Sequence, residues 1–216
     1  MTTGRTPLPF DAIVLAGGAA RRLGGADKPR LTVGGRSLLE RVLDACAAAR
    51  TTVVVGPEGP GSESSGTAAA TRKLRWTREQ PAGGGPVAAV AAALAEPALR
   101  SPVLLLLAAD LPFLDAGAVR RLVAALTDDE ASGPQAAMLV DAEGRDQPLA
   151  AAYRSAPLRA ALDALGDPAG QPLRRLTGGL RTLRLPDPDG ASQDCDTWED
   201  LARARHRAAQ EQAADE

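Results

Sequence analysis

Cysteine is scarce in this sequence, and so are the patterns that mark zinc-binding, disulfide-bonded and membrane-spanning proteins. The 216 residues include only two cysteines, Cys46 and Cys195, which form no Cys-x-x-Cys pair. Neither a disulfide framework nor a zinc site is therefore expected. The longest apolar stretch, residues 103–109, is far too short to span a bilayer, and residues 1–9 lack the apolar core of a signal peptide. We expect a cytoplasmic protein with no membrane partner.

Aromatic residues and net charge are also low. Aromatic side chains make up 2% of the sequence and apolar side chains 44%, so alanine, leucine and valine must fill the core. The formal net charge of −2 argues against a general nucleic-acid-binding surface. No Ser/His/Asp or Cys/His set is evident in the sequence, so nothing indicates a nucleophilic side chain.

Strand and helix signals alternate along the chain. The expected strands are residues 12–15, 52–55, 73–77, 102–108, 136–141, 149–153 and 180–185. The expected helices are residues 37–49, 87–96, 115–126, 155–165 and 173–177, followed by a last helix that opens at Thr197. This alternation predicts an α/β fold with a three-layer α/β/α, doubly wound, mostly parallel, Rossmann-like sheet.

A segment rich in glycine and cations follows the first strand. Residues 11–31 read DAIVLAGGAARRLGGADKPRL. Glycine allows close approach of the backbone to a ligand, consecutive amides can form an anion-binding nest, and Arg21, Arg22 and Lys28 add positive charge. The pattern favours a polyphosphate ligand over a solvated basic loop. It fits neither a P-loop, because Lys28 is followed by proline, nor a Rossmann fingerprint, because its glycines are paired.

The most apolar predicted strand ends on a carboxylate. Residues 104–114 read LLLLAADLPFL, so Asp110 stands at the edge of the sheet where ligands bind in such folds. Mg²⁺ prefers one or two carboxylates together with substrate phosphates, which makes Asp110 a candidate metal ligand. The structural alternative is that Asp110 only caps the following turn.

Three further segments have ordinary structural readings as well. Residues 78–86 (REQPAGGGP) form either a second place of close backbone approach at a helix start or a plain loop. Residues 144–149 (GRDQPL) fit a solvated hairpin turn. Residues 193–197 (QDCDT) fit the cap of the last helix.

The segment LAGGAARRLGGADKP resembles the signature LAGGxxxRxGxxK of the sugar-nucleotide-type nucleotidyltransferases. It is most similar to the molybdenum cofactor guanylyltransferase family, and the resemblance covers residues 12–204. It implies a nucleotide-diphospho-sugar transferase type of fold. It also implies Mg²⁺-dependent transfer of GMP from GTP to the phosphate of molybdopterin, with release of pyrophosphate. The alternatives are a cytidylyltransferase or sugar-phosphate nucleotidyltransferase of the same fold, or a nucleotide-binding module without turnover.

The resemblance divides one domain, residues 11–207, into a nucleotide half (about 11–115) and an acceptor half (about 116–207), between flexible ends at 1–10 and 208–216. It implies a monomer that binds GTP and molybdopterin, with transient contact with cofactor-biosynthesis or acceptor enzymes. The implied catalytic residues are Arg22, Lys28 and Asp110. The implied nucleotide-binding residues are Leu15, Ala16, Gly17, Gly18, Lys28, Gly56, Glu79, Gln80, Gly85 and Asp110. The implied acceptor-binding residues are Arg145, Gln147 and Asp194, and the implied metal ligands are Asp110 and Asp196.

The chain departs from the family pattern at four of these positions. Gln80 stands where an aspartate is expected, beside Glu79, so either side chain is a candidate to meet the nucleotide. Gly56 stands where relatives carry asparagine. Asp194 and Asp196 replace two asparagines, which keeps the oxygen ligands and adds negative charge.

Overall fold

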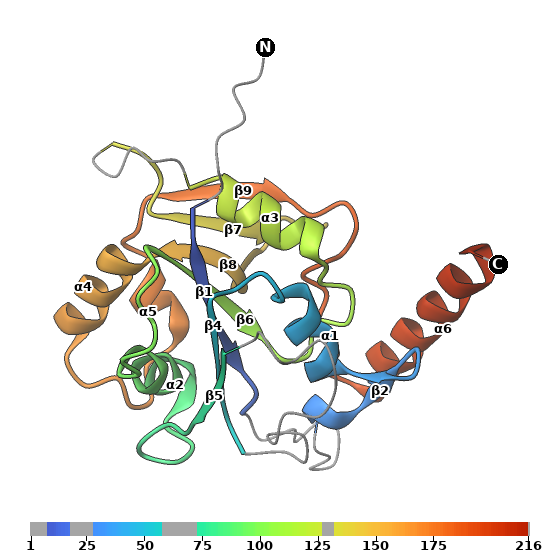
Figure 1. Cartoon of the computed structure of the whole chain (residues 1–216), viewed down its shortest axis with the longest axis horizontal. Coiled ribbons are helices and arrows are strands. Elements are labelled where there is room, and N and C mark those ends of the chain that lie inside the picture. The colour runs from blue at the N-terminus through green and yellow to red at the C-terminus, as the bar shows by residue number, and fades with distance from the viewer. Residues whose placement is uncertain (1–7, 18–27, 58–72, 127–131, 216) are drawn as a thin grey trace.

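A seven-stranded, mostly parallel sheet forms the centre of the computed structural model, which describes residues 8–17, 28–57, 73–126 and 132–215 (Figure 1). The strands are β1 (Phe10–Leu15), β4 (Thr51–Val55), β5 (Lys73–Thr77), β6 (Val103–Ala108), β7 (Ala136–Val140), β8 (Asp146–Arg154) and β9 (Thr182–Pro186). Their spatial order is β5-β4-β1-β6-β8-β7-β9. Strand β8 runs antiparallel to both of its neighbours, and the other neighbouring pairs are parallel.

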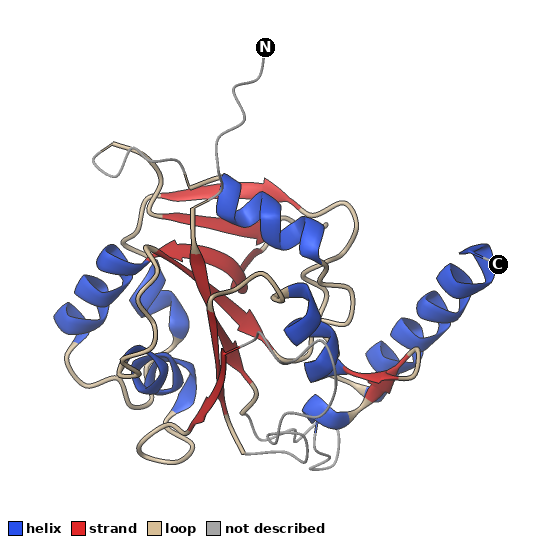
Figure 2. Ribbon diagram, viewed as in Figure 1, coloured by secondary structure: helices blue, strands red, loops and turns tan. Residues whose placement is uncertain are grey.

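Helices cover both faces of this sheet (Figures 1 and 2). The helices are α1 (Leu38–Ala45), α2 (Gly85–Leu94), α3 (Ala116–Ala124), α4 (Ser155–Leu165), α5 (Leu173–Thr177) and α6 (Trp198–Asp215). Helices α1 and α3 share one core with the sheet, and α2, α4 and α5 share the other. The arrangement confirms the expected three-layer α/β/α fold.

Helices cover the central strands on both faces, which explains the continuous apolar sequence of these strands. In β6, Leu105 and Leu107 pack toward α1 and α3, whereas Leu104 and Leu106 pack toward the opposite helices. All four side chains are fully buried. Burial stabilises the fold by roughly 1.5–3 kcal/mol for each such side chain relative to an exposed one. A strand covered on both sides cannot show the polar alternation of a half-exposed strand.

Local capping signals fix two helix starts. Ser37 and Glu40 form a capping box at the start of α1, and the Asp115 carboxylate accepts a hydrogen bond of 2.6 Å from the Ala118 amide at the start of α3. Helix α1 ends at Ala45 rather than near residue 49 as expected. Its last turn tightens there, because the Ala47 amide bonds to the Asp44 carbonyl three residues back.

The chain ends differ from the sequence-based expectation. Strand β1 begins at Phe10, inside the segment expected to be flexible, and Phe10 is buried. Helix α6 continues to Asp215, although a flexible tail was expected from residue 208. Ala208 is buried against the rest of the protein, and Arg207 pairs with Glu211 one turn later, so packing and an i,i+4 ion pair both favour helix here.

A small third core joins α6 to a hairpin that the sequence analysis did not anticipate. The short strands β2 (Thr32–Val33) and β3 (Arg36–Ser37) pair antiparallel, directly after a 3-10 turn at Lys28–Arg30. The buried side chains of this core are Val33, Leu38, Cys195, Leu201, Ala204 and Ala208. The last helix is therefore fixed against the segment that carries Lys28.

Candidate functional site

The ends of β1, β4 and β6 meet at one edge of the sheet, and the predicted nucleotide-binding residues follow them. The Ala16 amide donates a hydrogen bond of 2.8 Å to the Val55 carbonyl, and the Ala109 amide donates one of 3.0 Å to the Leu15 carbonyl. The turn that starts at Ala16 therefore lies between the residues that follow β4 and those that follow β6. Ligands bind at this edge of doubly wound sheets.

Gly56 allows two backbone segments to approach each other at this edge. A Cβ atom at Gly56 would lie 2.9 Å from the carbonyl carbon of Ala16 and 3.0 Å from its oxygen. A larger residue would therefore displace the turn at Ala16 and Gly17. The contact explains a glycine at this position through packing, and direct contact between Gly56 and a nucleotide stays a prediction.

Of the two adjacent candidates after β5, Glu79 is the one that faces this turn. Its carboxylate oxygens lie 3.8 and 3.9 Å from the point that a Cβ atom on Gly17 would occupy. One of them accepts a hydrogen bond of 3.2 Å from the Gly83 amide. Glu79 is half-buried, whereas Gln80 is exposed. Gly85, the first residue of α2, has φ of +88°, which favours glycine.

Lys28 joins two carboxylates that are far apart in the sequence. Its ammonium nitrogen lies 2.5 Å from Oδ1 of Asp196 and forms an ion pair with Asp110 as well. The Lys28 and Asp110 side chains are 16% and 15% exposed, whereas that of Asp196 is 47% exposed. Burial alone would lower the pKa of Lys28, but the charges and hydrogen bonds of Asp110 and Asp196 raise it above its ordinary value. Lys28 is therefore positively charged at neutral pH.

The segment before α6 is fixed to the segment after β6. The Cys195 amide donates a hydrogen bond of 3.2 Å to the Asp110 carbonyl. This bond places Asp194 and Asp196 beside Asp110. Burial of the carboxylate and the negative charges of Asp196 and Asp110 raise the pKa of Asp194 above its ordinary value, although the residue as a whole remains exposed. The carboxylates of Asp110, Asp194 and Asp196 thus lie close to the single ammonium group of Lys28.

Replacing Asp194 by asparagine should stabilise the protein at neutral pH. The folded state raises the pKa of Asp194, so its contribution to stability is fully present below the unfolded pKa and is lost as the pH rises through the folded pKa. We expect the Asp194→Asn variant to have a higher Tm than the wild type at pH 7, by about 2–4 °C for each kcal/mol of repulsion removed. Thermal denaturation as a function of pH measures this difference.

The gain in Tm should shrink as the pH falls and vanish below about 3.9, the ordinary pKa of an aspartate. The exposed Asp163 of α4 supplies the matched control. Asp163→Asn should leave Tm unchanged at pH 7 and also below the ordinary pKa of an aspartate. An Asp194→Asn variant with a lower Tm than the wild type at pH 7 would show that the ionised Asp194 carboxylate stabilises the fold, which would contradict the prediction.

Asp110 and Asp196 are the expected magnesium ligands, and their binding of a metal stays a prediction. Among the described residues there is no group of three or more His, Cys, Asp or Glu side chains that could hold a metal by themselves. Asp110 and Asp196 nevertheless approach one point, the position of the Lys28 ammonium nitrogen. Mg²⁺ is commonly bound by one or two carboxylates, with substrate phosphates and water completing its shell.

Arg145 lies in the turn between β7 and β8, and Gln147 is the second residue of β8. This turn lies at the same edge of the sheet. Both side chains bond to the Asp141 carboxylate, each at 2.8 Å, and Arg145 also pairs with Glu143 at 3.1 Å. The Arg145 side chain is 72% exposed. The structure thus places both residues at the expected edge. Their contact with an acceptor stays a prediction.

Two of the expected residues, Gly18 and Arg22, lie outside the described residues. Cys195 stands between two candidate site residues, and its surroundings disfavour the thiolate form. Its side chain is buried, and burial together with the charges of Asp110 and Asp200 raises the pKa of its thiol to about 12. The thiolate needed for nucleophilic attack is therefore absent at neutral pH.

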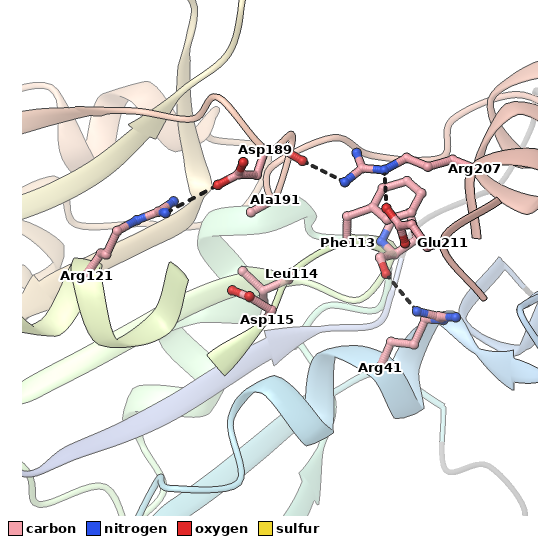
Figure 3. A pocket seen from close by; sticks show the side chains of 10 residues that line it. Arg41, Phe113, Leu114, Asp115, Arg121, Asp189, Ala191, Arg207 and Glu211 are labelled. Carbon is pink, nitrogen blue, oxygen red and sulfur yellow. Dashed lines mark hydrogen bonds and ion pairs between the residues drawn. The ribbon is translucent and has the colours of Figure 1, made fainter. Parts of the chain in front are cut away.

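A cavity of about 300 Å³ lies between α1, α3 and α6 (Figure 3). The loop at Pro112–Leu114, which follows Asp110, lines it. Three arginines line it: Arg41, Arg121 and Arg207. None of the three was among the predicted site residues. Arg41 bonds to two backbone carbonyls, those of Val33 and Pro112, which lie 8 and 71 residues away. No local sequence signal could have identified such partners.

In the part of the chain that the structure describes, we find no helix with the length and apolarity that a membrane crossing requires.

Comparison with known proteins shows which family the chain belongs to. Residues 12–184 match the family model described as MobA-like NTP transferase domain. The chain is 36% identical over 147 residues to a molybdenum cofactor guanylyltransferase from Rhodopseudomonas palustris (strain BisB5), covering 66% of this chain and 65% of that protein. A protein of the same name from Bradyrhizobium sp. (strain ORS 278) is 29% identical over 218 residues, which cover 97% of this chain and 98% of that protein.

A solved structure supports the same assignment at the level of the fold. The crystal structure of molybdopterin-guanine dinucleotide biosynthesis protein A from Archaeoglobus fulgidus has a TM-score of 0.65 at 22% sequence identity. The match covers 93% of this chain and 99% of that chain. This likeness confirms the expected nucleotide-diphospho-sugar transferase type of fold, and the chain belongs to the family of MobA-like NTP transferase domains.

Proposed function

We propose that the protein transfers GMP from GTP to the phosphate of molybdopterin and releases pyrophosphate, as a step of molybdenum cofactor biosynthesis in the cytoplasm. The observation that carries this proposal is the meeting of Ala16, Lys28, Asp110 and Asp196 at one edge of the sheet. The names of the relatives from Rhodopseudomonas palustris and Bradyrhizobium support the choice of guanine nucleotide and acceptor.

The reaction requires no protein nucleophile, because the acceptor phosphate already carries the attacking oxygen. A bond forms between this oxygen and the α-phosphorus of GTP. The bond from the α-phosphorus to the oxygen that bridges the α- and β-phosphates breaks, and pyrophosphate leaves with the electron pair. The lack of a reactive thiol at Cys195 agrees with such a direct displacement. The protein must then act mainly by positioning the two substrates and neutralising their charge.

Each part of the site has one task in this proposal. The turn at Leu15–Gly17 holds the nucleoside, with Glu79 beside it. Lys28 neutralises the triphosphate and the departing pyrophosphate. Arg145 and Gln147, at the same edge, face the acceptor.

Asp110 and Asp196 would hold Mg²⁺, which supplies a Lewis acid that withdraws negative charge from phosphate oxygens. Counted as ionised, the three carboxylates of Asp110, Asp194 and Asp196 carry a formal charge of −3, and the Lys28 ammonium group reduces the total to −2. One divalent cation balances this sum.

Pyrophosphate release should identify the nucleotide. The protein is incubated with molybdopterin, Mg²⁺ and each of the four ribonucleoside triphosphates in turn, and pyrophosphate is measured. We expect release with GTP at a rate at least about tenfold above that with the others, equivalent to about 1.4 kcal/mol of discrimination. Release with CTP alone would identify a cytidylyltransferase instead. Protection of the fold by GTP without any pyrophosphate would indicate a binding module.

A further inference from the structure

The segments that carry the three charged groups of the site are connected by two arginines outside it. Lys28 precedes the β2–β3 hairpin, Asp110 precedes the loop at Pro112–Phe113, and Asp196 follows the loop at Asp189–Ala191. These segments are far apart in the sequence. Their charged side chains meet at Lys28, so the relative position of the segments sets the geometry of the site.

Arg41 of α1 joins the first segment to the second. Its Nε donates a hydrogen bond of 2.9 Å to the Val33 carbonyl, and its Nη1 donates one of 3.2 Å to the Pro112 carbonyl. The guanidinium group is planar and rigid, so two bonds from one fork fix the distance between the two carbonyls. Pro112 lies only two residues beyond Asp110, and Figure 3 shows Arg41 beneath this loop.

Arg207 of α6 joins the second segment to the third. Its guanidinium lies 3.8 Å from the centre of the Phe113 ring, a cation–π contact. Its Nη2 donates a hydrogen bond of 2.9 Å to the Asp189 carbonyl, as Figure 3 shows. The Asp187 carboxylate then braces the following turn through the amides of Ala191 and Ser192, at 2.9 and 2.7 Å. That turn leads directly to the carboxylates before α6.

Resting on the proposed function, we infer that Arg41 and Arg207 are positioning residues for nucleotidyl transfer. Both bind the Pro112–Phe113 loop, Arg41 from α1 and Arg207 from α6. Together they fix the relative positions of the segments that carry Lys28, Asp110 and Asp196. Neither arginine touches these three side chains, so each acts through the backbone. The two arginines make these bonds at the wall of the cavity that they line.

Arg121 offers a matched control in the same cavity. It comes from α3 and reaches only the Asp189 carboxylate, at 3.5 Å. The Arg121 side chain is 46% exposed and that of Asp189 is 72% exposed, so both reach solvent. An exposed pair of this kind contributes little to stability. Removing Arg121 therefore changes the charge of the cavity wall without breaking a connection between the site-bearing segments.

The test compares Arg41→Ala, Arg207→Ala and Arg121→Ala by kinetics with GTP, molybdopterin and Mg²⁺. We expect kcat to fall by about 10- to 100-fold in the first two variants, because displacement by about 1 Å has such effects. Arg121→Ala should retain the kcat of the wild type. Arg41→Lys, which keeps the charge but cannot form the planar fork, should fall between Arg41→Ala and the wild type.

Amide hydrogen exchange supplies a readout that does not depend on activity. The Cys195 amide, which bonds to the Asp110 carbonyl, should exchange faster in Arg41→Ala and Arg207→Ala, while amides of β6 keep their protection. A lower Tm with unchanged kcat and unchanged Cys195 exchange would overturn the inference and leave a purely structural role. A wild type that is inactive with GTP would overturn the proposed function alone, because the exchange pattern still tests the connection.

Discussion

Replacing Lys28 by methionine should lower kcat for pyrophosphate release by about 10²- to 10³-fold, which corresponds to about 3–4 kcal/mol of barrier. Lys28 is the described cation in direct contact with both candidate metal ligands, Asp110 and Asp196. Its largely buried position strengthens its electrostatic effect relative to a solvated lysine. Methionine keeps the length and apolar character of the stem, so the change removes little besides the charge.

The only other lysine of the sequence provides the control. Lys73 is exposed at the start of β5, the edge strand of the sheet. Lys73→Met should retain the kcat of the wild type. Turnover of Lys28→Met within about twofold of the wild type would remove Lys28 from the mechanism, since each tenfold effect corresponds to about 1.4 kcal/mol.

The same variant tests whether the two carboxylates fit a cation. Without the Lys28 ammonium group, Asp110 and Asp196 repel each other, and an unpaired, mostly buried carboxylate destabilises a fold. We therefore expect Lys28→Met to have a lower Tm than the wild type in the absence of divalent metal. Added Mg²⁺ should restore much of that loss, because an ion that binds only the folded state stabilises it.

Replacing Asp110 by asparagine should have an effect of similar size. The amide side chain would keep the shape of the aspartate but lose the charge that pairs with Lys28 and that would bind Mg²⁺. We expect kcat to fall by about 10²- to 10³-fold. The Mg²⁺ concentration for half-maximal activity should also rise, whereas a residue that only caps a turn would leave this concentration unchanged.

Circular dichroism should show that Asp110→Asn remains folded, because the apolar cores on both faces of the sheet do not involve the Asp110 side chain. Asp163→Asn, on the exposed surface of α4, is the control for loss of one carboxylate. A variant of Asp110 with the Mg²⁺ dependence and kcat of the wild type would contradict the assignment of the metal to this residue.

Much of the fold could be predicted from local patterns in the sequence. The continuous apolar run of β6 indicated a central strand covered on both faces, and the structure confirms it. Ser37 with Glu40 indicated the start of α1, and Asp115 that of α3, because helix caps are local hydrogen bonds. The predicted element over residues 173–177 also agrees with the structure, where it forms α5.

The sequence could not reveal how the elements are ordered in space. The hairpin turn expected near residue 144 indicated that β8 runs antiparallel to β7. The position of β8 between β6 and β7, antiparallel to β6 as well, is decided by the packing of the whole sheet. The β2–β3 hairpin was not predicted because each strand has only two residues, too few for a periodic pattern.

The candidate site was predictable where its parts belong to continuous segments. The glycine-rich turn and Asp110 were singled out because each follows a strand directly. The contact between Lys28 and Asp196 spans 168 residues and arises only when α6 packs on the β2–β3 hairpin. The partners of Arg41 are carbonyl groups, which every residue has, so no residue type marks them.

A structure of the protein with GTP and Mg²⁺ would show where the triphosphate lies relative to Lys28 and Asp110. We expect the triphosphate to contact the Lys28 ammonium group and the backbone at Leu15–Gly17, with the metal on Asp110. A nucleotide bound elsewhere, for example in the cavity between α1, α3 and α6, with Lys28 still pairing only with the two aspartates, would contradict this expectation.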